Sequence, residues 1–351
     1  MTPAINESRL SYLYEAVQCG TVRAAADRLD IAPSAVSRQI ALLEAELALP
    51  LIERHKRGVH LTQAGRLLME YYREQRAHQE DLLAKLQEVR GLRRGHIRLA
   101  VGEGFVSDLM GAPLQYFCKR YPDITLTLDL AGTNEVMRLV AEDDADIGLV
   151  YNPPAEPKIV SRAQMAQPVH AIVAPGSPLI AQAANAAATQ AAEAMRATGA
   201  MGATRAATNA TKAIQAGDAT HADGRHQPGA LTLDALYDVP LALMHGAYGT
   251  RQLMELAEQS EKHRLTPTVT TNSISVLKHF VRAGLGATFL PTFAVSQEIE
   301  AGVLCAVPID HPILNSAEAH LITRAGRRLS GAANRLLTHL ASKMEAFGAP
   351  G

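Results

Sequence analysis

The chain has 351 residues, a formal net charge of −1 and a hydrophobic content of 47%. This length allows about two or three domains, and the apolar content is enough to build sizeable cores. The nearly neutral charge indicates no general basic patch, so any affinity for nucleic acid must depend on a few placed cations.

The cysteines and the hydropathy pattern restrict the class of protein further. Cys19, Cys118 and Cys305 have neither a disulfide-framework spacing nor a zinc-site spacing, so we expect reduced thiols and no bound metal. The N-terminus has no apolar signal segment, and no run approaches the ~18 apolar residues of a membrane span. We therefore expect a cytoplasmic protein that does not bind a membrane.

Residues 21–43 have the pattern of two short amphipathic helices joined by a tight turn. In the first helix, apolar residues form one face, and small alanines among them let another helix cross closely: Val22, Ala25, Ala26 and Leu29. Pro33 and Ser34 suit the start of the second helix, because proline is tolerated in a first turn and serine accepts an orphan amide hydrogen. The stretch predicts a helix-turn-helix; the alternative is an ordinary helical hairpin.

The second helix separates an inner face from an outer one. Val36, Ile40 and Leu43 are predicted to point inward. The remaining side chains are then free to enter a major groove, with contacts expected from Pro33, Ser34, Ser37, Arg38 and Gln39. In the alternative hairpin, Arg38 is merely solvated.

Residues 49–65 predict a small β-wing that follows the helices. Leu51 and Ile52 form an apolar anchor, a basic turn follows, and Thr62 can cap a new helix. DNA affinity is then expected to depend on placed cations that hold the backbone or the minor groove: Arg23, Arg54, Lys56 and Arg57.

The segment from Arg9 to Gly65 resembles the winged DNA-binding domain of LysR-type transcriptional regulators. The family's running pattern is present at Ala25-Ala26, Ser37-Arg38, Leu43-Glu44 and Leu61-Thr62-Gln63-Ala64-Gly65. Two departures matter. Ile52 replaces a usual phenylalanine, and Pro33-Ser34 replaces a frequent glutamine-proline pair that commonly reads a base. The operator preference of relatives is therefore not carried over to this chain.

Residues 62–90 contain no proline and predict one long helix with an apolar stripe. The domain around it is too small to bury the stripe, so pairing with a second copy is expected, the alternative being packing against its own chain. The resemblance implies antiparallel pairing between subunits, giving a homodimer or homotetramer. Gly91 and Gly95 then mark a hinge.

Beyond the hinge, strands and helices alternate, which implies a parallel sheet. The strands include 96–101, 124–130 and 146–150, a crossover is expected over 164–168, and the chain returns around 304–309. This half resembles the periplasmic-binding-protein-like effector domain of the same regulators. The expected fold is thus a mostly α winged helix-turn-helix (1–65), a linker and dimerisation helix (66–92) and an α/β effector domain (93–351). Its two expected subdomains are 93–163 with 311–351, and 164–310.

Ligands of parallel α/β sheets bind beyond the carboxyl ends of the strands. The residues at those positions predict a cleft for a small, polar, anionic effector: Gly104, Phe105, Val106, Thr133, Asn134, His245, Asn272 and Ser273. The amides at the helix start around Phe105 and Val106 are expected to bind its anionic group. Alternatively, Thr133 and Ser273 cap helices and His245 is an ordinary loop histidine.

Two further segments have distinctive patterns that do not predict a site. Gly102-Glu103-Gly104 resembles a dinucleotide fingerprint, but Ser107 stands at the third glycine, so no nucleotide cofactor is expected. Residues 181–230 are rich in alanine and poor in large apolar side chains, which predicts a disordered insertion with at most transient helix over 181–196.

Two functional classes remain at this level. In the first, operator DNA is bound by dimer pairs, a small metabolite closes the effector cleft, and changed DNA bending alters the access of RNA polymerase, which is then a further partner. In the second, the α/β half is an enzyme or a solute-binding protein. No nucleophile elbow, phosphate loop or paired acid-base set is apparent, so we expect a transcriptional regulator and no enzyme.

Overall fold

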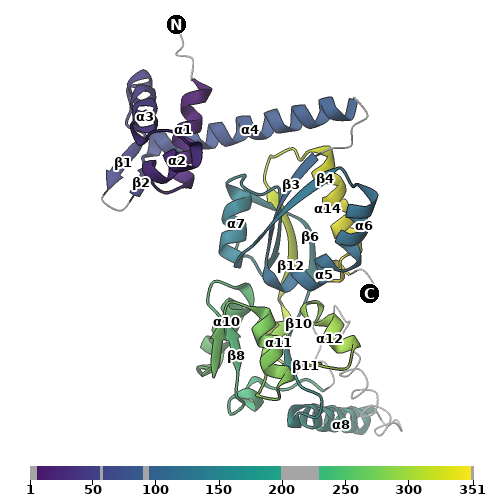
Figure 1. Ribbon diagram of the computed structural model, residues 1–351. Coiled ribbons are helices and arrows are strands. Elements are labelled where there is room, and N and C mark those ends of the chain that lie inside the picture. The colour runs from purple at the N-terminus through teal and green to yellow at the C-terminus, as the bar shows by residue number, and fades with distance from the viewer. Residues whose placement is uncertain (1–5, 56–57, 90–94, 199–228, 349–351) are drawn as a thin grey trace. The chain divides into compact units, whose positions relative to one another are not determined.

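We describe a computed structural model of the chain over residues 6–55, 58–89, 95–198 and 229–348 (Figure 1). The chain divides into two compact units, Met1–Leu83 and Ala84–Gly351. The first unit is mainly helical, and the second contains all the larger sheets.

The N-terminal unit is three helices, a β-hairpin and the first part of a long helix. The elements are α1 (Glu7–Gln18), α2 (Val22–Leu29), α3 (Pro33–Leu47), β1 (Ile52–His55), β2 (Gly58–Leu61) and α4 (Gln63–Val89). Their shared core buries apolar side chains from all three helices, from β1 and from α4, including Leu10, Ala25, Ile40, Ile52 and Met69. The winged helix-turn-helix architecture is therefore confirmed.

Local sequence explains where these helices begin and end. Thr21 accepts a hydrogen bond from the Ala24 amide at 3.1 Å and caps α2, and Asp30 ends α2 in the left-handed region at φ 55°. The Thr62 hydroxyl accepts from the Gly65 amide at 3.0 Å and caps α4, as the sequence predicts. The start of α3 differs from the prediction, because Ala32 is its N-cap residue and no side chain, Ser34 included, caps it.

The first subdomain of the second unit is a five-stranded sheet in the order β4-β3-β5-β12-β6. Its strands are β3 (Gly95–Val101), β4 (Ile124–Leu130), β5 (Ile147–Tyr151), β6 (Ile159–Ala166) and β12 (Glu318–Arg324). β3 pairs in parallel with β4 and β5, whereas β12 is antiparallel to β5 and β6. The expected all-parallel sheet is thus mixed, because the last strand returns from the other subdomain.

Helices cover both faces of this sheet (Figure 1). α7 (Thr133–Ala141) packs its apolar side on one face, where Val136 and Val140 meet Ala100 and Ile322. α6 (Ala112–Arg120) and α14 (Gly331–Lys343) pack together on the other face. Each face of the sheet is therefore buried, as is usual for a sheet with parallel strands.

The second subdomain is built around a three-stranded antiparallel sheet. β7 (Val169–Val173) lies between β10 (Thr288–Pro291) and β11 (Cys305–Pro308). β8 (Ala242–Met244) and β9 (Val269–Thr271) form a parallel pair, each followed by a helix, α10 (Gly249–Glu261) and α11 (Ile274–Arg282). The chain enters this subdomain through Gln167 and Pro168 and leaves it between β11 and β12.

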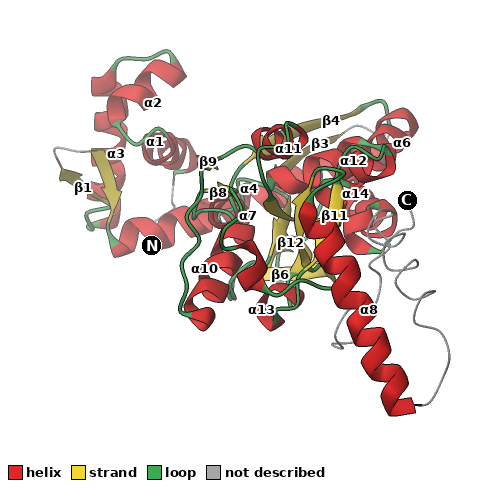
Figure 2. Cartoon of the chain, turned by 90° about the horizontal axis from the view of Figure 1, so that it is seen from below, coloured by secondary structure: helices red, strands yellow, loops and turns green. Residues whose placement is uncertain are grey.

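The alanine-rich segment differs from its prediction over 181–198. Helix α8 (Pro178–Thr198) starts beside β11 (Figure 2) and buries Leu179, Ala183 and Ala187, which are spaced one helical turn apart. Small alanine side chains let this helix face approach its neighbours closely, so Ala183 and Ala187 are buried along with Leu179. The rest of the predicted insertion, 199–228, lies outside the described residues.

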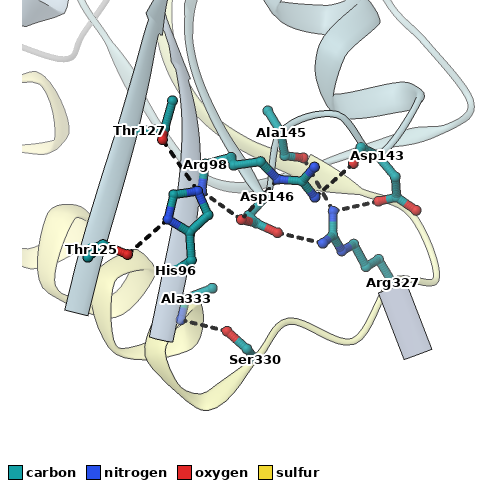
Figure 3. A network of polar contacts seen from close by, with 10 residues as sticks. All are labelled: His96, Arg98, Thr125, Thr127, Asp143, Ala145, Asp146, Arg327, Ser330 and Ala333. Atoms are coloured by element: carbon teal, nitrogen blue, oxygen red, sulfur yellow. Dashed lines mark hydrogen bonds and ion pairs between the residues drawn. The ribbon is translucent and has the colours of Figure 1, made fainter. Parts of the chain in front are cut away.

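A network of ion pairs and hydrogen bonds joins the loop between α7 and β5, the end of β12 with the loop that follows it, and the middle of β3. Figure 3 shows the part of it made by Arg98, Asp143, Asp146 and Arg327. Asp143 accepts from Arg324 Nη1 and from Arg327 Nη1, both at 2.6 Å. Asp146 accepts from Arg327 Nη2 at 2.5 Å and from the Arg98 backbone amide at 2.7 Å. The side chains of Asp143 and Arg327 are only 5% and 7% exposed. The network therefore fixes the point at which the chain enters the effector domain.

His170, in the central strand β7, makes the stability of this domain depend on pH. Its side chain is 2% exposed, and its Nδ1 lies 3.0 Å from the Pro168 carbonyl oxygen. Burial lowers the pKa of His170 to about 4, from 6.5. As the pH falls below 6.5, the unfolded chain takes up a proton that the native state refuses, so the free energy of unfolding decreases.

We expect His170→Leu to remove about 2 kcal/mol of the stability difference between pH 7 and pH 5. Urea denaturation of wild type and variant at both pH values measures this difference. Burial raises the pKa of Asp108 to about 6, so Asp108 makes the free energy of unfolding increase as the pH falls. Wild type and His170→Leu both contain Asp108, so its contribution cancels when the two are compared. His279→Leu, which removes an exposed histidine of α11, is the control. An unchanged pH dependence in His170→Leu would contradict the assignment.

Candidate functional site

Helix α3 presents a polar outer face and an apolar inner face. Pro33, Ser34 and Arg38 are exposed, and Ser37 and Gln39 are half-buried. Val36, Ile40 and Leu43 lie on the opposite side and are fully buried in the core. The five predicted groove-reading residues of this helix are therefore all at least partly accessible.

The outer face is held in place by contacts between α3 and the hairpin. Glu44 Oε1 accepts from the amides of Leu51 and Ile52 at 2.8 and 3.2 Å, which explains the leucine-glutamate pair at the end of the recognition helix. Gly65 has no room for a side chain, because a Cβ there would lie 2.1 Å from the Leu51 carbonyl oxygen. The Val59 amide donates to the Gly20 carbonyl at 2.9 Å and fixes β2 against the turn before α2.

The predicted backbone-binding cations are only partly described. Arg23 on α2 is exposed, and within the described part of the chain neither Arg23 nor Arg38 is bonded to another residue. Arg54 is in β1, although only its backbone is described, and Lys56 and Arg57 lie outside the described residues. Both described cations are thus available to an anionic partner.

The apolar stripe predicted along α4 divides into two parts. Leu68 and Met69 are buried in the N-terminal core, where Tyr72 also packs, so this part contacts its own chain. Other members of the helix expose large apolar side chains to solvent: Leu67, Tyr71, Leu82, Leu83 and Leu86. An exposed series of this length on one helix is typical of a surface that contacts another protein.

In the effector domain, the ends of β3, β4 and β5 meet the elements that follow β8, β9 and β10. We call this region the subdomain boundary. The boundary elements that follow β3 and β10 are η1 (Glu103–Phe105), α5 (Val106–Met110) and η3 (Thr292–Ala294). Phe105 of η1 packs on Phe293 of η3 with ring centroids 4.8 Å apart, so the centre of the boundary is apolar.

Thr133 joins the two subdomains through its hydroxyl. The residue is 5% exposed, its Oγ1 accepts from the Gly249 amide at 3.0 Å and it donates to the Tyr151 carbonyl at 3.4 Å. Gly249 has no room for a side chain, since a Cβ would lie 2.0 Å from the same carbonyl oxygen. Thr133 does not cap α7, whose N-cap residue is Gly132. Its hydroxyl is therefore engaged within the protein, which differs from the expected free ligand group.

Ser273 forms a second contact across the boundary, with Glu103. The Ser273 hydroxyl donates to Glu103 Oε1 at 3.0 Å, and Ser273 occupies the N-cap position of α11 without a side-chain capping bond. A third contact is made by Lys278 of α11, whose Nζ donates to the Ser107 hydroxyl at 3.2 Å. The alternative role of Ser273, a side-chain cap of α11, is thus not seen in the structure.

The amides around Phe105 and Val106, which the sequence predicts to bind an anionic group, are bonded within the protein. The Phe105 amide donates to the Gly102 carbonyl at 2.9 Å, and the Val106 amide donates to the Glu103 carbonyl. Because both donors are used within the turn, they are not free for an anionic ligand. Gly104 lies beside α11, where a Cβ would be in ordinary contact with Ile274 Cδ1 at 3.4 Å.

The remaining predicted residues lie at the rim of the boundary. Asn134, His245 and Asn272 are exposed. The amide of His245 donates to the Thr271 carbonyl at 3.0 Å, and the Asn272 carbonyl accepts from the Tyr248 hydroxyl at 3.2 Å. These contacts hold the loops that precede α10 and α11 in fixed positions.

Two other kinds of site are absent from the described residues. Within residues 6–55, 58–89, 95–198 and 229–348, no group of three His, Cys, Asp or Glu side chains is placed to hold a metal ion. In the same part of the chain, no helix has the length and apolar character that a membrane crossing requires.

Two family models cover most of the chain. The model of the bacterial regulatory helix-turn-helix protein, lysR family, matches residues 8–66, and the model of the LysR substrate binding domain matches 90–197 and 221–345. The chain belongs to the LysR family. It is a DNA-binding transcriptional regulator with a C-terminal effector domain.

Named relatives of this LysR regulator span nearly its whole length. The RuBisCO operon transcriptional regulator of Allochromatium vinosum is 26% identical, over 88% of this chain and 86% of its own. The HTH-type transcriptional activator CmpR of Synechocystis is 21% identical, over 93% of this chain and 92% of its own. Full-length OxyR from Pseudomonas aeruginosa has a TM-score of 0.60 at 17% identity, with 96% of this chain and 97% of that chain covered. The OxyR likeness confirms the two-part fold.

Sequence reasoning missed three residues of the regulator's subdomain boundary. In the sequence Glu103 stands out only within a weak dinucleotide fingerprint, whereas in the structure its carboxylate accepts from Ser273. Gly249 and Lys278 give no signal, because their partners lie 116 and 171 positions away in the sequence.

Proposed function

We propose that this LysR regulator reads operator DNA through the outer face of α3. Pro33, Ser34, Ser37, Arg38 and Gln39 would enter the major groove. Arg23, Arg54, Lys56 and Arg57 would hold the phosphate backbone or the minor groove. The observation that carries this proposal is the separation of faces on α3, with Val36, Ile40 and Leu43 buried and Arg38 exposed and unpaired within the described residues. A solved relative, full-length CbnR with its target DNA, has the same fold with a TM-score of 0.51.

The exposed apolar residues of α4 support a homo-oligomer. Leu67 is 64% exposed, and Leu82, Leu83 and Leu86 add further apolar surface on the same helix. Burial of this surface against a second copy would place two recognition helices on one operator, either in a homodimer or in a homotetramer. RNA polymerase is then the protein partner whose access to the promoter the regulator changes.

The effector would bind at the subdomain boundary and change transcription by shifting its geometry. The groups placed there are Gly104, Phe105, Val106, Thr133, Asn134, His245, Asn272 and Ser273. Bonds such as Thr133 to Gly249 cross the boundary, so a bound molecule that alters them would alter the relative position of the two subdomains. The regulatory domain of CcmR from Synechocystis, solved in complex with 2-PG, has the same fold with a TM-score of 0.50.

The regulator would act by binding alone, in the cytoplasm, without catalysing a reaction and without a cofactor. The named relatives are transcriptional regulators, and the polar groups of the boundary are bonded to one another rather than arranged as an acid-base or nucleophile pair. A turnover screen with the purified chain tests the absence of catalysis.

We expect Arg38→Ala to weaken binding to the regulator's own upstream DNA by about 1–3 kcal/mol and to relax its sequence preference. Arg23→Ala should lower affinity on all sequences and reduce the salt dependence of binding by about one phosphate contact. Gel shifts on specific and scrambled DNA at several salt concentrations separate the two effects. Lys119→Ala, which removes an exposed cation of the effector domain, is the control. Unchanged operator affinity in both arginine variants would overturn the DNA interface.

A further inference from the structure

Glu103 places a carboxylate at the subdomain boundary, close to the start of α11. The side chain is half-buried, and its Oε1 accepts from the Ser273 hydroxyl at 3.0 Å. Burial, and then the charge of Glu103, raise the pKa of the Tyr248 hydroxyl, so this carboxylate also lies near Tyr248. Within the described residues, no cationic side chain is paired with it.

Three of the four Lys and Arg side chains on the boundary helices are already paired with carboxylates. Four helices begin at the boundary, namely α5, α7, α10 and α11, and α5 carries no Lys or Arg. Lys278 is paired with Glu298 of α12 (Ser296–Glu300) at 3.0 Å, and Arg251 is paired with Glu258 at 2.6 Å. Arg138 of α7 is paired with Glu135 at 2.7 Å, and Arg282 lies at the far end of α11.

An anionic ligand would therefore meet an uncompensated negative charge. The two amides expected to receive it, those of Phe105 and Val106, are bonded within their own turn. The positive end of α11 is the remaining source of attraction, and Glu103 is the carboxylate placed beside it. A second carboxylate there would compete with Glu103 and be repelled by it.

From this balance of charge we infer that the effector is a small cationic molecule, an amine, amidine or guanidine, whose positive group pairs with Glu103. The inference rests on the proposed effector function of the subdomain boundary. The ligand's cation would replace the Ser273 hydroxyl or share the carboxylate with it, since a carboxylate has about four acceptor positions. Pairing with a charged donor is stronger than the neutral bond from Ser273, so the ligand changes a contact that joins the two subdomains.

Calorimetry on the full-length chain tests the inference with matched pairs of probes that differ mainly in charge. Putrescine is compared with succinate, and benzamidine with benzoate. We expect at least one cation to bind and neither carboxylate to bind. In Glu103→Gln, which keeps the acceptor for Ser273, the Kd of that cation should rise at least tenfold. Glu103→Lys should lose the cation and gain binding of a carboxylate. Asp123→Asn, which alters an exposed carboxylate just before β4, should leave the Kd unchanged.

Each other result overturns the inference. Binding of a carboxylate probe to wild type, binding of a cation equally to wild type and Glu103→Gln, or binding of neither probe class would contradict a cationic effector. A gel shift with the upstream DNA on the same samples distinguishes this failure from failure of the proposed function. If the chain binds DNA but no cation, only the inferred positive charge of the effector is wrong. If it binds neither, the proposed mechanism of the regulator is wrong as well.

Discussion

Asp143→Asn should lower the free energy of unfolding of the effector domain by about 3 kcal/mol. Asp143 is nearly buried and neutralises Arg324 and Arg327, each at 2.6 Å. Asparagine has nearly the same shape and tolerates the left-handed backbone found here, φ 63°, so the substitution removes charge without adding strain. Arg324 and Arg327 then both lose a carboxylate in a nearly buried position, although Arg327 keeps its ion pair with Asp146.

Urea denaturation of the full chain measures the loss, and hydrogen exchange of peptides from β5 and β12 assigns it to the effector domain. Asp129→Asn is the matched control, because Asp129 is an exposed residue of the edge strand β4. It should change stability by no more than about 0.5 kcal/mol. Equal stability of wild type and Asp143→Asn would mean that the network contributes little to this domain.

Gly249→Ala should abolish the transcriptional response and lower the stability of the effector domain by about 3 kcal/mol. The new Cβ would lie 2.0 Å from the Tyr151 carbonyl oxygen and 3.1 Å from Thr133 Oγ1. A backbone carbonyl cannot rotate away as a flexible side chain can, so α10 must move from the end of β5. That movement also breaks the bond from the Gly249 amide to Thr133.

Gly246, in the loop just before α10, supplies the control for this second prediction. A Cβ at Gly246 would come no closer than 3.7 Å, to the end of the Glu255 side chain, so Gly246→Ala should keep both response and stability. Reporter induction and urea denaturation are measured on both variants, with a gel shift to check that operator affinity is retained. If the two glycine variants behave alike, the close packing at the subdomain boundary has no part in the response.

Local sequence patterns determined the elements of the DNA-binding domain. The period of apolar residues in α2 and α3 fixes which faces are buried, and the Thr62 hydroxyl caps α4 as its position predicts. The crossover predicted over 164–168 is partly right, because 164–166 end β6 and Gln167 and Pro168 lead on to β7. These features depend on neighbours within a few positions, which a single sequence contains.

The chemistry of the effector domain was decided by tertiary structure. Thr133 and Ser273 were found at strand ends from sequence, yet their hydroxyl partners, Gly249 and Glu103, lie 116 and 170 positions away. The pairing of Asp143 with Arg324 spans 181 positions. α8 packs because its alanines meet a neighbouring surface, not because they are apolar enough to fold alone. A hydrogen bond or a close contact needs two partners, and one sequence shows each partner's chemistry without showing which of them the fold brings together.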